Sequence, residues 1–279
     1  MTRQPARLRS LPRKVRAAPA RVPQLLRAMR REPIETLLYI PEQLSQWVHP
    51  PVSYEVEEDW GPSFHEMLGL QWPCPEVDAS RELWERINDE LAAKGLAVGR
   101  WTSGRYSDAD PVLAACVWCA VRHLGPTKVV ETGVARGLTS RVILEAIAAN
   151  GAGHLWSVDL PDPFGTAELE GQTGAAVPDQ LRANWTYVRG SSRRQLRQLV
   201  HQLGTVDIFV HDSLHTVRNM RFEMETVWPA LRNGGFLLVD DVDKAAFRDF
   251  LQRTDRHESR VHRSGDGPWM WGVVQRVSG

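Results

Sequence analysis

Acidic residues follow two apolar stretches in the second half of the sequence, and a histidine accompanies the first group. Asp212 and His215 come directly after the apolar run 206–211 (VDIFVH), and Asp240 and Asp241 come directly after a second run. Nearly continuous apolar runs of this length are typical of parallel strands buried on both faces. Because such strands end at one edge of a sheet, where ligands bind, we expect the three carboxylates and the imidazole to lie together.

The residue types in this group suggest a metal-assisted reaction. Crowded carboxylates repel each other unless a cation or protons neutralise them, and hard oxygen ligands favour Mg²⁺. The ion could bind two neighbouring hydroxyls of an acceptor and lower the pKa of the one that reacts. His215, with an ordinary pKa of about 6.5, is suited to take the proton. The alternative is structural, since Asp212 or Asp241 could simply cap the following helix.

A glycine loop lies between a strand pattern and a helix pattern in the stretch 128–144 (KVVETGVARGLTSRVIL). Gly133 and Gly137 let the backbone approach a ligand closely, and the first amides of the helix carry partial positive charge. A dinucleotide-binding loop would read G-x-G-x-x-G, whereas these glycines are spaced G-x-x-x-G with Glu131 just before them. The loop favours a nucleoside-like cofactor. An ordinary strand–helix–strand unit without a ligand is the alternative.

The next predicted strand, 154–159, ends in Asp159, at a position where a carboxylate can accept both ribose hydroxyls of an adenosine. With this acid in place, the sequence resembles the class I S-adenosylmethionine-dependent methyltransferases. Their first motif is an acid followed by a glycine loop, and their second is the ribose-binding acid. The resemblance implies that Glu131 and the glycine loop line the methionine end of the cofactor and that Asp159 holds the ribose.

The adenine ring is expected beside the turn 190–192, although many relatives carry an acid where Ser191 or Ser192 stands. One of these serines could instead cap the helix 193–203. The cofactor residues implied by the resemblance are Glu131, Thr132, Gly133, Ala135, Gly137, Ser140, Asp159, Ser191, Ser192 and Asp212.

A narrower resemblance covers roughly residues 108–274. The combination D-S-x-H after the fourth predicted strand and D-D after the fifth is similar to metal-dependent O-methyltransferases that tailor sugars on macrolides and related natural products. In that group aspartates hold Mg²⁺ and a histidine acts as the base. The resemblance implies that Asp212, Asp240 and Asp241 are metal ligands and that His215 is the base. His211 is either a residue that supports this site or a packed, hydrogen-bonded histidine.

The expected fold is α/β, a Rossmann-like sheet of seven strands that is mostly parallel with an antiparallel last strand. Every charged residue from Arg3 to Arg31 is basic, and residues 1–33 predict a flexible arm. Residues 34–107 predict a helical and irregular extension that covers the substrate or contacts another subunit. Residues 108–279 predict the methyltransferase domain. Asp110-Pro111 marks the start of its first helix, and Ser80 is expected to cap a helix over 80–93.

Composition excludes several classes of protein. The formal net charge is zero, so no overall field favours nucleic acid. No apolar run approaches the roughly 18 residues of a membrane span, and the prolines of the basic start oppose an amphipathic transit peptide, so we expect a cytoplasmic protein. Three cysteines make no disulfide framework. Cys116 and Cys119 form a C-x-x-C inside a predicted helix, 111–124, and are expected to be core thiols rather than redox or zinc ligands.

Three further segments could contribute to a substrate site. Trp60, Phe64 and Trp72 either line a pocket or belong to the core. Asp108 lies in a loop with Tyr106 that either covers the cofactor or caps a helix. The irregular stretch 161–178 predicts a substrate lid.

The sequence therefore predicts an O-methyltransferase that acts on a hydroxyl of a small molecule, a sugar or a natural-product glycoside, with S-adenosylmethionine and Mg²⁺. A contact in a homo-oligomer through the N-terminal extension is also expected. The alternatives are a metal-independent methyltransferase, an NAD-dependent oxidoreductase and a non-catalytic adaptor with the same fold.

Overall fold

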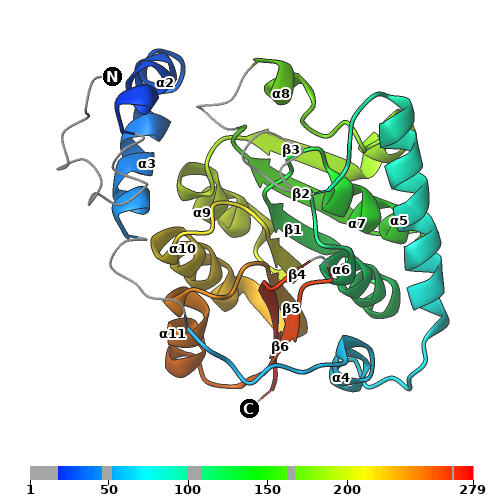
Figure 1. Cartoon of the computed structure of the whole chain (residues 1–279). Helices are drawn as coiled ribbons and strands as arrows, with labels where there is room; N and C mark the ends of the chain where they lie inside the picture. The colour runs from blue at the N-terminus through cyan, green and yellow to red at the C-terminus, as the bar shows by residue number, and fades with distance from the viewer. Residues whose placement is uncertain (1–17, 46–51, 100–107, 162–166, 266, 279) are drawn as a thin grey trace, which may run out of the picture.

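A seven-stranded sheet forms the centre of the protein (Figure 1). The computed structural model describes residues 18–45, 52–99, 108–161, 167–265 and 267–278. The strand order is β3-β2-β1-β4-β5-β7-β6, with β7 antiparallel to both of its neighbours. This order confirms the expected methyltransferase-type sheet. The strands are β1 Lys128–Thr132, β2 His154–Asp159, β3 Trp185–Arg189, β4 Val206–His211, β5 Leu231–Val239, β6 His257–Arg263 and β7 Met270–Arg276.

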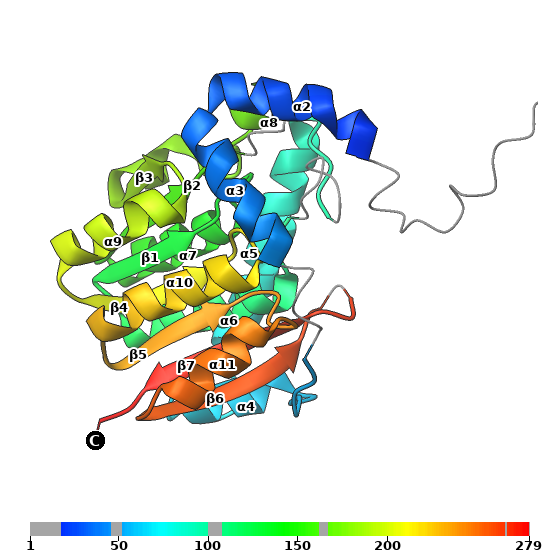
Figure 2. The same ribbon diagram turned by 90° about the vertical axis from the view of Figure 1, so that its left-hand side faces the viewer.

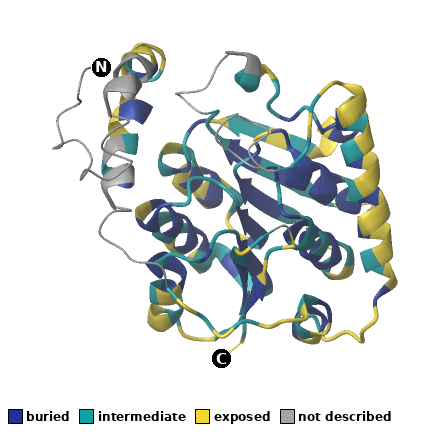
Figure 3. Cartoon of the chain, viewed as in Figure 1, coloured by how far each residue is buried: buried dark blue, intermediate teal, exposed yellow. Residues whose placement is uncertain are grey.

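Helices cover both faces of the sheet, so that successive strand residues enter different cores. Val129 packs in the cluster formed with α5, α6 and α7, whereas Val130 packs in the cluster formed with α9, α10 and α11. Figure 3 shows the strands as the most continuously buried part of the chain. The helices of these two layers are α5 Pro75–Ala93, α6 Pro111–Leu124, α7 Leu138–Asn150, α9 Ser192–Leu203, α10 Val217–Val227 and α11 Ala245–Arg253.

The N-terminal segment is more helical than expected. Helix α2 (Ala18–Arg31) occupies part of the predicted flexible arm, with Pro19 in its first turn, where proline is tolerated. Helix α3 (Pro33–Ser45) continues past Pro41 instead of breaking there. Helix α3 lies beside α9 and α10, whereas α2 packs on α3 and lies near α8 (Figures 1 and 2). Residues 18–31 are thus helical where the sequence predicted an arm.

Two other boundaries differ from the sequence prediction. Helix α5 begins at Pro75, because proline suits the first turn of a helix, and Ser80 is an interior residue whose hydroxyl donates to Val77 O. The segment Asn233-Gly234-Gly235, whose residue types are typical of a turn, lies within β5, which begins at Leu231 with an irregular register against β4. Two short helices, α4 (Trp60–Met67) and α8 (Ala167–Gly171), complete the described α-helices.

Candidate active site

The chain reverses its direction across the sheet between β1 and β4, which are neighbours although β2 and β3 separate them in sequence. In open α/β sheets such a switch point opens a crevice at the carboxyl ends of the strands. Here the two strand ends are in direct contact. Gly133 has φ of 89°, and a Cβ at this position would lie 2.0 Å from the backbone oxygen of Asp212. Only glycine therefore lets the loop after β1 lie against the start of the acidic segment.

Glu131 ends with its carboxylate inside the protein, at the base of the glycine loop. Its Oε2 accepts hydrogen bonds from the hydroxyls of Ser140 and Ser157, both at 2.6 Å. Its Oε1 is buried and has no hydrogen-bond partner among the described residues. Burial raises the pKa of Glu131 to about 7, although the two hydroxyls oppose that change. A cationic ligand beside Oε1 would satisfy this oxygen and favour the ionised carboxylate.

Asp159, at the end of β2, lies against the same loop. Its carboxylate accepts hydrogen bonds from the amides of Val134 and Ala135, while burial raises its pKa to about 6. Ala135 has φ of 47°, an uncommon left-handed conformation for a residue with a side chain. The loop therefore turns its amides toward the acid at the end of the next strand.

The second half of the predicted lid is fixed to this loop. Gly174 N donates to Ala135 O, and Ala176 N donates to Arg136 O, both at 2.9 Å. Arg136 in turn forms a buried ion pair with Asp108 at 3.6 Å. Asp108 therefore supports the glycine loop, and the capping role belongs to Asp110, which accepts from the amides of Val112 and Leu113. Tyr106 and residues 162–166 lie outside the described part of the chain.

The predicted acidic group converges on His215. Nε2 of His215 lies 3.7 Å from Asp212 Oδ1 and 3.7 Å from Asp240 Oδ2, and Nδ1 lies 3.2 Å from Asp241 Oδ2. The four side chains are 18–26% exposed, so the group opens to solvent. Among the described residues, Asp212, His215 and Asp240 can each offer one ligand atom within 4.8 Å of the others. Asp241 faces the other nitrogen of the imidazole ring.

The charges of this group shift one another's pKa values. Burial alone would lower the pKa of His215, but its hydrogen bond to Asp241 and the three negative charges raise the pKa to about 10. Burial and the neighbouring acids raise the pKa of Asp212 and Asp240 above the usual range. Asp241 has a lowered pKa despite burial, because His215 stabilises its charge. A divalent cation among the aspartates would neutralise the charge that keeps His215 protonated.

Of three polar residues expected near the cofactor, Thr132 and Ser192 have side chains engaged elsewhere. The Thr132 hydroxyl donates to Glu223 Oε2, on the face of the sheet opposite to Glu131. The Ser192 hydroxyl donates to Asn219, and the buried Ser191 hydroxyl has no partner among the described residues. Ser191 is the residue before α9, yet its side chain makes no capping hydrogen bond. The predicted serine cap was therefore wrong.

Glu223 is a fully buried residue of α10 that was not predicted from the sequence. Its carboxylate accepts hydrogen bonds from His211 Nδ1 at 2.5 Å, Ser213 at 2.7 Å and Asn219 at 2.8 Å. Burial opposes ionisation of Glu223, but the charge of His211 and hydrogen bonds from His211, Ser192 and Thr132 lower its pKa to about 2. His211 is thus the packed, hydrogen-bonded histidine of the structural alternative, and its ring contacts that of His215 with 5.4 Å between centroids. The sequence signal that could have identified Glu223 is its place as an acidic residue on the apolar face of a predicted helix.

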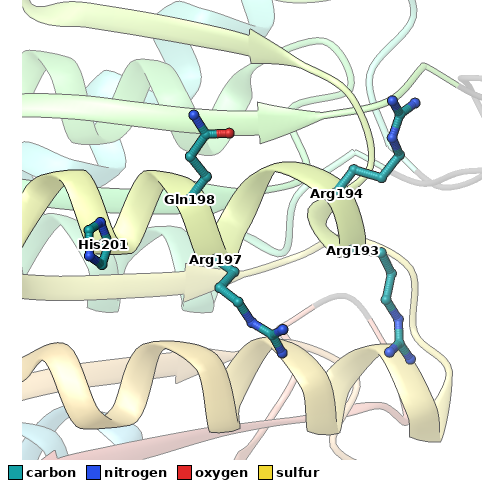
Figure 4. A pocket seen from close by; sticks show the side chains of 5 residues that line it. All are labelled: Arg193, Arg194, Arg197, Gln198 and His201. Carbon is teal, nitrogen blue, oxygen red and sulfur yellow. The ribbon is translucent and has the colours of Figure 1, made fainter.

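A hollow of about 490 Å³ lies on the outer surface of α9 (Figure 4). Two of its arginines hold helix α3, because Arg193 pairs with Glu42 at 2.7 Å and Arg194 pairs with Glu35 at 3.2 Å. No predicted site residue lines it. The lining residues are Arg193, Arg194, Arg197, Gln198 and His201.

Residues 130–242, from β1 to the end of the acidic group, match a protein family described as "Methyltransferase domain". This part of the chain is a methyltransferase domain. Among characterised proteins, L-olivosyl-oleandolide 3-O-methyltransferase of Streptomyces antibioticus is 32% identical over 73 residues. That match covers 24% of this chain and 19% of the relative, so the chain matches only about a fifth of the relative's length.

Solved structures resemble the methyltransferase domain in fold. An O-methyltransferase from Bacillus cereus in complex with SAH has a TM-score of 0.53 at 13% identity, covering 78% of this chain and 98% of the other. An O-methyltransferase from Streptomyces achromogenes involved in tomaymycin synthesis, in complex with SAM, has a TM-score of 0.50 at 11% identity, covering 71% and 90%. At these identities the likeness concerns the fold alone. Among the described residues, no helix is both long and apolar enough to cross a membrane.

Proposed function

We propose that this protein is an S-adenosylmethionine-dependent O-methyltransferase that acts on a hydroxyl of a small molecule. The observation that carries the proposal is the contact between two half-sites in one crevice. Gly133 brings the cofactor loop against Asp212, and Asp212 lies 3.7 Å from His215. A methyl donor held by the loop would therefore lie beside the acidic group.

The residues of the glycine loop suit the donor. Glu131 Oε1, which has no hydrogen-bond partner among the described residues, would receive the ammonium of the methionine portion. Asp159, at the end of β2, would hold the ribose. S-adenosylmethionine supplies an activated methyl group, so the protein has mainly to align the acceptor oxygen with it. We propose cofactor contacts for the remaining loop residues, Ala135 and Gly137, and for the turn at residues 190–192.

The acidic group suits a divalent cation and a base. The carboxylates of Asp212 and Asp240 lie within 4.8 Å of each other and of His215, and carboxylate oxygens favour Mg²⁺. When bound, the ion would neutralise the aspartates and polarise the acceptor hydroxyl. His215 would then lose its proton near neutral pH and could accept the one from the acceptor. We retain Asp212, Asp240 and Asp241 as the proposed ligands and His215 as the proposed base.

The acceptor class rests on the relative from Streptomyces antibioticus, whose name describes methylation of a sugar hydroxyl on a macrolide precursor. We propose a glycoside of a natural product as the acceptor. A cytoplasmic location and the absence of a nucleic-acid partner stay predictions. The expected homo-oligomer contact through the extension also stays a prediction, and the exposed apolar side chains of α2 and α3 are compatible with it.

Ligand-dependent thermal unfolding tests the donor assignment. S-adenosylhomocysteine should raise the melting temperature, and NAD should not, because only a ligand of the folded state stabilises it. Asp159→Asn should lose most of the shift, and the exposed His201→Ala should keep it. A shift with NAD alone would favour the oxidoreductase alternative.

Methyl transfer to a panel of macrolide glycosides, with and without chelator, tests the rest of the proposal. Turnover that stops with chelator and returns with Mg²⁺ is expected. Turnover indifferent to chelator would favour a metal-independent methyltransferase. The adaptor alternative predicts no turnover on any acceptor.

A further inference from the structure

A second group of potential metal ligands lies outside the crevice, on the helical layer that contains α5 and α6. It consists of His65 in α4, Cys74 immediately before α5, and His123 in the last turn of α6. His123 precedes β1 by only a few residues, so the group lies toward the amino ends of the strands. Asp212 and Asp240 follow strands and lie at the opposite edge. The two groups are therefore separate sites.

His65 has the environment of a metal-binding histidine. The residue is fully buried, and its Nδ1 lies 2.7 Å from Gly61 O, to which it donates a hydrogen bond. This bond leaves the lone pair on Nε2, which is buried without a partner among the described residues. In metal sites the second ring nitrogen of a histidine ligand typically donates to a backbone carbonyl in this way.

Cys74 and His123 complete the group. Cys74 Sγ lies 3.1 Å from His123 Nε2, and one ligand atom of each of the three residues lies within 4.8 Å of the others. In a tetrahedral zinc site, bond lengths of about 2.0 to 2.3 Å place neighbouring ligand atoms roughly 3.3 to 3.6 Å apart. Shifts of about 1 Å would bring the three atoms to those separations. Cys119, one helical turn before His123, interacts with Cys74.

We propose that His65, Cys74 and His123 bind a Zn²⁺ ion that links α4 and the start of α5 to α6. Two imidazoles and a thiolate are borderline-soft donors that suit Zn²⁺ rather than Mg²⁺. Binding releases the Cys74 thiol proton to solvent and leaves a Zn–S bond. His123 is exposed, so an ion can reach the site from the surface. The ion has a structural role, because it joins α4 to the start of α5 and to α6, which Glu76 already links through hydrogen bonds from Trp118 and Arg122.

Metal uptake by the full-length protein tests the proposal. The reduced protein is stripped with chelator and titrated with Zn²⁺ and separately with Co²⁺, whose absorption reports thiolate ligation in a tetrahedral site. The experiment uses a background with Asp212→Asn and Asp240→Asn, so that the acidic group does not contribute. One equivalent of Zn²⁺ should remain after desalting, and Co²⁺ should give thiolate-to-metal absorption. At a hundredfold excess over Kd, Zn²⁺ should raise the melting temperature by about 5 °C.

Single substitutions assign the ligands. Cys74→Ser and His123→Gln should each weaken Zn²⁺ binding on the order of 100-fold. His123 is exposed, so His123→Gln should fold normally, as checked by circular dichroism. Cys116→Ala, in the same helix but outside the group, is the matched control and should bind Zn²⁺ as before. The proposal is overturned if the stripped protein takes up no Zn²⁺, or if both ligand variants bind it as tightly as the control.

Discussion

The two edges of the sheet carry side-chain groups with opposite properties. At the carboxyl ends, Asp212, His215 and Asp240 follow strands and are 18–26% exposed. At the amino ends, His65, Cys74 and His123 come from helices or a helix start, and two of the three are buried. The first group offers mainly oxygen and is open to a substrate, whereas the second offers nitrogen and sulfur and is nearly closed. In this protein the proposed catalytic group therefore lies where parallel strands end, and the proposed structural zinc group lies where helices meet.

Among the substitutions that test this comparison, replacement of His215 should have the largest effect, a loss of turnover. His215→Ala removes the proposed base, and general base catalysis contributes roughly 10² to 10⁴-fold to rate. We expect turnover to fall by that factor while S-adenosylhomocysteine binding, measured by calorimetry, stays within about twofold. The exposed His201→Ala is the control. Near-normal turnover of His215→Ala would remove His215 from the reaction.

Metal exchange should distinguish the proposed Mg²⁺ site from the proposed Zn²⁺ site. After chelation, Mg²⁺ should restore turnover without restoring the melting temperature, and Zn²⁺ should restore the melting temperature. Asp240→Asn should lower turnover by about 100-fold and abolish its response to Mg²⁺, since one charged ligand is gone. The Zn²⁺-dependent melting shift of this variant should equal that of the wild type. If Mg²⁺ alone restored both turnover and the melting temperature, the two sites would not have the separate roles proposed here.

Glu223 should contribute to the pH dependence of the free energy of unfolding at acidic pH. Its pKa falls from 4.5 to about 2 on folding, so its ionised form stabilises the folded state above pH 4.5, and this contribution is lost as the pH falls toward 2. Glu223→Gln should lower the free energy of unfolding at pH 7 by about 3 kcal/mol, because His211 loses a buried charged partner. It should also flatten the acid dependence, as measured by urea unfolding between pH 2 and pH 7. The matched control is Glu225→Gln, which replaces an exposed glutamate of the same helix.

Glu131 should give the smallest effect, a pH dependence of cofactor binding. The ammonium of the cofactor favours the ionised carboxylate, whose pKa is raised to about 7, so affinity should rise as the pH rises. We expect S-adenosylhomocysteine to bind about tenfold more tightly at pH 7.5 than at pH 6. Glu131→Gln should remove most of this slope, leaving the smaller part due to Asp159, whose pKa is about 6. An unchanged slope would place the ammonium elsewhere.

Much of the fold could be predicted from local patterns. The run 206–211 and the Asp110-Pro111 start define their elements because burial on both faces and helix capping leave signatures in adjacent residues. Helix α2 was missed because basic charge and proline are typical of an arm. In the structure, contacts such as the Arg31–Glu170 ion pair hold this segment on the domain. Helix propensity alone does not report such contacts.

The sequence by itself determined the order of the strands along the chain, the glycine loop, the acids within β1 and β2 and the acids that follow β4 and β5. These features depend on residue type and short-range spacing. Only the tertiary structure decided that Asp241 faces the opposite ring nitrogen of His215 from Asp212 and Asp240. The tertiary structure alone also placed Glu223 beneath His211 and brought His65 to Cys74 and His123. The reason is that packing between elements remote in the chain sets these distances, and no local pattern in the sequence encodes them.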